Sequence, residues 1–208
     1  MKKELLAAWR FFLSLEDDLN ESFTYVEPLI SSNKDTVSLH FQKIINSSCI
    51  EIENLLGLIS EEHYGLKPSN IKKGRKDWNI NLFKKVLDIK SITITEEIAV
   101  NKILEEVISK PFNPYDNWSE SHAPDWWIIN NKIKHSKRIN YQSANLFNCI
   151  FSLGGLLSIF KVVCDITGEL DTETLEMGTN LLYMNNISSR FNVSYYLTGE
   201  SVIDGGDF

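Results

Sequence analysis

Apolar residues recur at three- and four-residue steps along much of the chain, which is the spacing of amphipathic helices. This pattern predicts helices over residues 4–22, 36–60 and 79–89. It is clearest in the second segment, whose apolar stripe comprises Val37, Phe41, Ile44, Ile45, Ile52, Leu55, Leu56 and Ile59. The first half of the chain therefore predicts an all-α fold.

Residues 91–110 fit two interpretations. Residues 92–95 alternate as a strand does, whereas Thr93 and Glu96 have the spacing of a helix capping box. The apolar residues that follow favour a helix over residues 96–109. Prolines and asparagines between residues 111 and 124 then predict an irregular crossing segment.

Two further helices are predicted over residues 124–140 and 143–167, with Pro124 in a first-turn position and Gly168 as terminator. The second is apolar almost all round, so it is expected to be the buried central helix. Its length would also suit a membrane span. Asn145, Asn148 and Lys161 make that unfavourable in lipid, and no membrane association is expected.

The predicted organisation is one helical bundle domain, residues 1–170, with a C-terminal appendage, residues 171–208. Within the appendage, the apolar runs at residues 181–184 and 190–197 are separated by an Asn-Asn turn signal and predict a small β-hairpin. The three cysteines have no metal-ligand spacing and lie in apolar helical runs, which indicates reduced core thiols. No export signal is recognisable, so a cytoplasmic location is expected.

Composition permits a sizeable core, since 43% of the 208 residues are hydrophobic. The net charge of −7 argues against a surface that wraps nucleic acid as a whole, because phosphate binding needs an excess of Lys and Arg. Any RNA contact must therefore be a local patch. One such loop contains Lys72, Lys73, Arg75, Lys76 and Trp78, although a charge run of this length is also typical of a solvated loop.

The helix over residues 124–140 carries the candidate chemistry. A helical wheel gives it a packing face of Trp126, Ile129 and Ile133. Its presented face comprises Trp127, Asn131, Lys134, His135 and Arg138. On that face, His135 suits general acid–base work on a ribose hydroxyl, and Lys134 and Arg138 suit the phosphate charge. Such chemistry needs no metal and no cofactor. The alternative interpretation of these residues is a solvated or salt-bridged polar face without a catalytic role.

Glu51 lies at the edge of the apolar stripe of residues 36–60, where a carboxylate is costly unless it is paired. We therefore expect His135 to lie within reach of Arg138 and of Glu51, with Glu53 as the second choice. Glu51 reaching water by its own length is the alternative. An exposed indole beside the basic cluster predicts self-association through the Trp126/Trp127 helix or its neighbours.

The block Asp125-Trp126-Trp127 to Lys134-His135-Ser-Lys-Arg138, followed by Ala-Asn-Leu-Phe-Asn and Leu-Gly-Gly-Leu-Leu, resembles HEPN-type helical proteins of prokaryotic defence and toxin–antitoxin loci. The resemblance implies an up-down helical bundle, usually dimeric, and a metal-independent ribonuclease. Active members of that family carry an arginine shortly before the histidine on one helix. Here Ile128, Ile129 and Asn130 stand in that region, so either Arg138 supplies the cation or the scaffold is inactive.

Two hypotheses follow. The first is a HEPN-like endoribonuclease of antiviral defence or growth arrest, with His135, Arg138, Lys134, Asn131 and Glu51 as site residues. The second is a non-catalytic helical scaffold or partner-binding subunit of a defence complex. Both imply a homodimer or a partner protein, and both allow RNA contact through a local basic patch.

Overall fold

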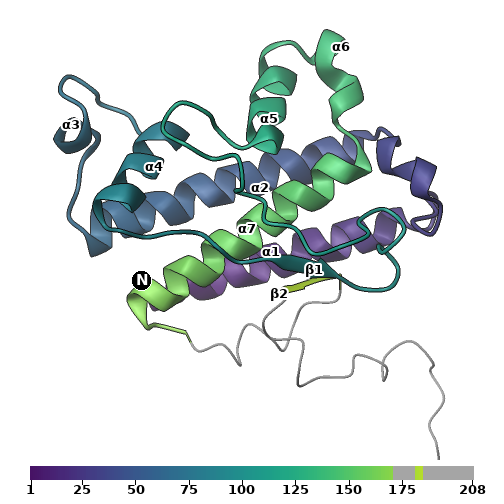
Figure 1. Cartoon of the computed structure of the whole chain (residues 1–208), viewed down its shortest axis with the longest axis horizontal. Coiled ribbons are helices and arrows are strands. Elements are labelled where there is room, and N and C mark those ends of the chain that lie inside the picture. Colours follow the sequence, from purple (N-terminus) through teal and green to yellow (C-terminus); the bar gives the residue numbers. More distant parts are fainter. Residues whose placement is uncertain (171–180, 185–208) are drawn as a thin grey trace, which may run out of the picture.

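The computed structural model describes residues 1–170 and 181–184, excluding the side chains of Lys137 and Arg138. The chain is mostly helical and contains a small two-stranded antiparallel sheet (Figure 1). Three long helices, α1 (Lys2–Ser22), α2 (Leu39–Leu58) and α7 (Leu146–Thr167), form the centre of the fold and contact one another. This confirms the predicted helical class.

The first two long helices follow the apolar periodicity of the sequence. α1 buries Leu5, Trp9, Phe12 and Leu19 on one stripe, as the spacing predicts. α2 begins later than expected, because the Ser38 side chain accepts the His40 N–H and so makes Ser38 the N-cap. A short π-helical turn (Ile59–His63) continues α2 to about the predicted end.

α7 is the central helix, as its all-round apolar sequence predicts. The Asn145 side chain caps its start by accepting the Asn148 N–H, and Gly168, with φ 63°, ends it in the left-handed conformation. Gly155 allows close approach of the neighbouring layer, because a Cβ there would lie 2.6 Å from Trp126 Cζ2. Any larger residue at this position would therefore displace the indole.

α7 is the one helix among the described residues that is long and apolar enough to cross a membrane, with a mean hydropathy of 1.9. In the structure 78% of its most apolar stretch is buried inside the protein. The core helix of a globular domain has the same length and composition. Burial by α1, α2 and α5 therefore accounts for its sequence without a bilayer.

Residues 96–109 do not form the predicted helix. Ile98–Val100 is strand β1, and it pairs antiparallel with β2 (Leu182–Met184) in the register Ile98↔Met184, Ala99↔Tyr183 and Val100↔Leu182. On its other edge, Ile98 exchanges two backbone hydrogen bonds with Phe112, at 2.8 and 2.9 Å. These long-range bonds use the backbone groups that a helix would have paired locally. Irregular turns follow the strand over residues 102–107.

The C-terminal segment was predicted to pair with itself as a hairpin. Its first strand does form at β2, but its partner in the structure is β1. Residues 190–197, the predicted second strand, lie outside the described residues. Leu181 and Leu182 are buried in the same core as the long helices, so this part of the tail packs with the bundle.

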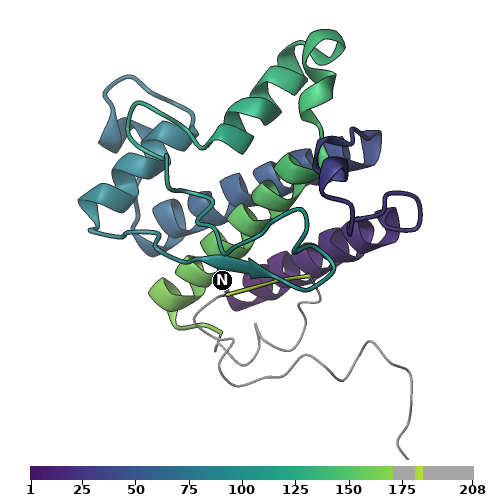
Figure 2. The same ribbon diagram turned by 45° about the vertical axis from the view of Figure 1, so that its right-hand side comes forward.

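The remaining helices lie on one side of α2. They are α3 (Pro68–Ile71), α4 (Ile80–Ile89, as predicted), α5 (Asp125–His135) and α6 (Lys137–Asn140), with single 3-10 turns at Ser31–Asp35 and Tyr141–Ser143. α4 and α5 both contact α2. Both views show α5 projecting from the bundle on the side that also carries α3 and α4 (Figures 1 and 2).

Candidate functional site

The helix that carries the candidate residues ends sooner than predicted. α5 stops at His135, and Ser136, with φ −148° and ψ 61°, separates it from α6. The Asn140 side chain stabilises this break by donating its amide hydrogens to the carbonyl oxygens of Lys132 (3.0 Å) and Ser136 (3.2 Å). Because the helix is interrupted, His135 and Arg138 do not share a helical face.

The buried side of α5 is wider than the wheel predicted. Trp126 and Ile133 are buried as expected, but Trp127, which was assigned to the presented face, is only 4% exposed. Its ring lies edge-on to Trp126, with centroids 5.9 Å apart. The prediction of an exposed indole is therefore wrong, and the basis it gave for self-association is removed, although the oligomeric state itself stays a prediction.

Asn130 is the feature of this helix that sequence reasoning missed. It lies one turn after Trp126, in the middle of the buried stripe, and its side chain is 1% exposed. Neither polar atom of its amide has a hydrogen-bond partner among the described residues, although the side chain lies beside the Cys49 thiol of α2. Its spacing from Trp126 and Ile133 was the signal that could have revealed its burial.

The exposed side of α5 presents Asn131, Lys134 and His135, as predicted. None of the three makes an ion pair within the part of the chain that the structure describes. Lys134 and His135 occupy the last turn of α5, where positive charge offsets the negative end of the helix dipole. The Arg138 side chain lies outside the described residues.

The expected pair between His135 and Glu51 is not formed. The Glu51 carboxylate instead accepts a hydrogen bond of 3.0 Å from the Asn54 side chain on its own helix. Glu51 is partly exposed, so water solvates its charge and the energetic argument for a cationic partner no longer applies. Glu53, the second choice, is also exposed and makes no ion pair with any described residue.

Glu53 and Lys134 nevertheless approach the same point on α2. Burial raises the pKa of the Cys49 thiol strongly; the charge of Lys134 lowers that pKa and the charge of Glu53 raises it. The helices that carry these residues, α2 and α5, contact each other. Cys49 and Asn130 are both buried, whereas Asn131, Lys134 and His135 are exposed.

The cysteines are not nucleophiles in the folded protein. Burial raises the pKa of Cys49 and Cys149, and it raises that of Cys164 to about 12. A thiol whose pKa is raised stays protonated as the pH increases, and the thiolate is the reactive form. We expect negligible reaction with a disulfide reagent at pH 8 and three reactive thiols after unfolding in urea. Rapid labelling of the native protein would contradict this.

Within residues 1–170 and 181–184, no three His, Cys, Asp or Glu side chains gather as metal ligands would. The described residues thus offer a cationic and amide-bearing helix end, without a buried acid–base pair. Such a surface can bind a phosphate or a carboxylate. No family model matches the chain, and comparison with curated proteins and with solved structures gave no significant match.

Proposed function

We propose that the protein is a HEPN-like helical protein of prokaryotic antiviral defence or growth arrest that binds RNA phosphates through Asn131, Lys134 and His135. The observation that carries this proposal is the exposed stripe at the end of α5. Asn131 and His135 lie one turn apart, Lys134 is adjacent, and neither Lys134 nor His135 forms an ion pair with a described carboxylate. An RNA phosphate supplies the charge that such a stripe lacks.

His135 is the group that can carry cleavage. Its neutral imidazole would accept the proton of a ribose 2′-hydroxyl as that oxygen attacks the adjacent phosphorus, and the bond to the 5′-oxygen would break. The leaving 5′-oxygen takes a proton from water, giving a cyclic phosphate and a 5′-hydroxyl, and His135 returns its proton to the solvent. Lys134 would stabilise the charge that develops on the phosphate oxygens.

A non-catalytic scaffold is the second candidate, and two observations favour it. The region where active HEPN proteins carry an arginine contains Asn130, which is buried. His135 also has no carboxylate to orient its ring among the described residues. In this function the same stripe would bind RNA or a partner protein without cutting it.

The His135→Ala variant separates the two candidates. If the protein is a ribonuclease, cleavage of RNA in the presence of a chelator should fall by about 10²–10⁴-fold, as expected for loss of a general acid or base. The fold should be unaffected, because His135 is exposed. The measurement is a single-turnover cleavage rate on labelled RNA.

The matched control is His63→Ala, which removes another exposed histidine distant in sequence from α5. It should cut RNA at the wild-type rate. A wild-type protein that cuts no RNA with chelator present, alone or with proteins encoded beside it, would rule out the ribonuclease and leave the scaffold. An unchanged rate in His135→Ala would remove His135 from the chemistry.

A further inference from the structure

A second cationic surface lies around α3, at a distance along the chain from α5. We define the α3 patch as the five cations Lys67, Lys72, Lys73, Arg75 and Lys76. All five side chains are exposed, and none makes an ion pair with another described residue. In a chain with net charge −7, this concentration of unneutralised positive charge marks a local site for anions.

The backbone gathers these cations in a defined turn. The Arg75 N–H donates to the Lys72 carbonyl at 3.1 Å, and Gly74 occupies the third position of the turn with φ 81°. This is the arrangement of a type II turn, in which glycine avoids the strain of a positive φ. The turn therefore presents the patch in a specific conformation.

Beside the turn is an open hollow of about 600 Å³. Lys67, Ser69, Arg75 and Lys76 are among the residues that line it. Glu61 also lines the hollow, and its carboxylate accepts a hydrogen bond from the Trp78 indole. Three cations against one carboxylate leave the hollow net positive, which suits a phosphate.

Trp78, the aromatic residue of this loop, is engaged through one ring face and through its indole nitrogen. Its ring is stacked on Phe83, with centroids 5.0 Å apart and planes inclined by 14°, and its N–H is engaged by Glu61. The five residues of the patch itself are all cations, which donate hydrogen bonds to phosphate oxygens. Binding there should depend on charge and salt, with little dependence on base sequence.

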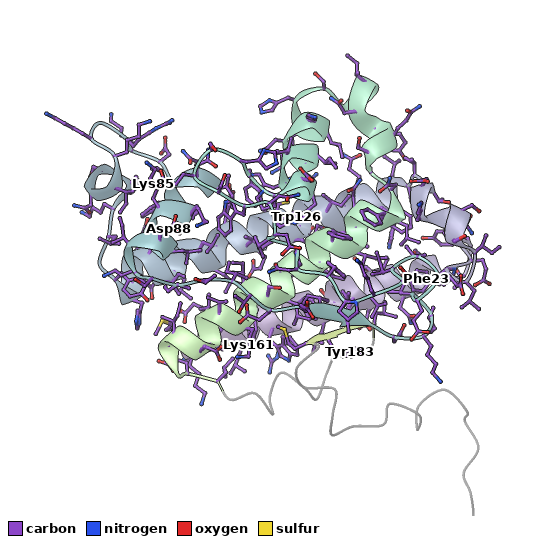
Figure 3. All side chains as sticks on the ribbon, in the orientation of Figure 1. Phe23, Lys85, Asp88, Trp126, Lys161 and Tyr183 are labelled. Atoms are coloured by element: carbon purple, nitrogen blue, oxygen red, sulfur yellow. The ribbon has the colours of Figure 1, made fainter. Side chains whose placement is uncertain are left out.

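We infer that the α3 patch is a backbone-binding site for single-stranded RNA that holds the same strand that contacts the α5 stripe. The inference rests on the proposed function and extends it to how substrate is held. Figures 1 and 2 show α3, α4 and α5 on the same side of the bundle, and α4 and α5 both contact α2. Nitrogen-tipped side chains extend outward around α3 (Figure 3).

The test compares two variants with the same change in net charge. The patch variant carries Lys72→Gln, Lys73→Gln, Arg75→Gln and Lys76→Gln. The control variant carries Lys3→Gln, Lys34→Gln, Lys102→Gln and Lys110→Gln, which replace exposed lysines that make no ion pair with described residues. Fluorescence anisotropy measures binding of a labelled oligouridine of about 16 nucleotides, the upper site size of compact single-strand binders.

The patch variant should bind at least about tenfold more weakly, while the control variant binds as the wild type does. The slope of log affinity against log salt should decrease by up to about 3, since each lost phosphate contact on a single strand removes about 0.7. Equal affinities of the two variants, or no binding by the wild type, would overturn the inference.

The result is independent of cleavage. If RNA binding depends on the patch but the protein cuts no RNA, this inference stands and the ribonuclease hypothesis is rejected. If the protein cuts RNA but the patch and control variants bind it equally, only the role of the α3 patch is rejected.

Discussion

Trp126→Ala is expected to lower the free energy of unfolding by about 3–5 kcal/mol, the range for removing a large buried aromatic side chain. Trp126 is 2% exposed and joins three parts of the fold. Its ring lies against Gly155 of α7, and its Nε1–H donates to the Pro114 carbonyl at 2.9 Å. It also makes an edge contact with Tyr115, with centroids 5.7 Å apart. Figure 3 shows it at the base of α5.

Urea unfolding followed by circular dichroism measures this change. Trp126→Phe should lose less stability, because it keeps an aromatic ring against Gly155, although it also loses the hydrogen bond to the Pro114 carbonyl. Tyr25→Ala is the exposed aromatic control, since Tyr25 is 62% exposed and should change stability by less than about 0.5 kcal/mol. A Trp126→Ala variant as stable as this control would show that α5 does not depend on the indole.

Glu16→Ala is expected to destabilise the protein by about 3–5 kcal/mol and to release β2. Glu16 is an acidic residue of α1 that is 1% exposed. Its Oε1 accepts the backbone N–H groups of Leu181 and Leu182, at 2.8 and 2.9 Å. Alanine leaves both buried donors unpaired, and each such donor costs about 1–3 kcal/mol.

Hydrogen exchange and limited proteolysis should detect the released strand before global unfolding. Asp17→Ala is the matched control, because Asp17 is the next acidic residue on α1 and is exposed. It should leave both the stability and the protection of residues 181–184 unchanged. If residues 181–184 were as well protected in the Glu16→Ala variant as in the wild type, the pairing with β1 alone would hold the strand.

The Glu16 hydrogen bonds tie residues 181 and 182 to the helical bundle. Residues 181–184 were assigned to a C-terminal appendage, yet Leu181 and Leu182 share the core of the bundle and are tied to α1 and β1. Removing residues 171–208 would therefore expose apolar surface of the bundle and remove two hydrogen-bond donors from the buried Glu16 carboxylate. Functional assays of this protein should use the full chain.

The sequence by itself determined most of the helices. α1, α2, α4 and α7 form where the apolar period is regular, because helical hydrogen bonds and caps are local and the stripe needs only a neighbour to cover it. The all-round apolar character of α7 also predicted its central position. The exposed positions of Asn131, Lys134 and His135 followed from the same periodicity.

Only the tertiary structure decided how the site residues relate to one another. A wheel reports the angle of a residue and does not report how much of the helix is covered, so the burial of Trp127 and Asn130 depended on α2 and α7. The end of α5 depended on a contact from Asn140 back to the Lys132 carbonyl. Residues 98–100 became a strand because partners at Phe112 and at residues 182–184 offered hydrogen bonds that no local window contains. Local periodicity thus selects the helices, whereas pairing and coverage depend on segments that meet only after folding.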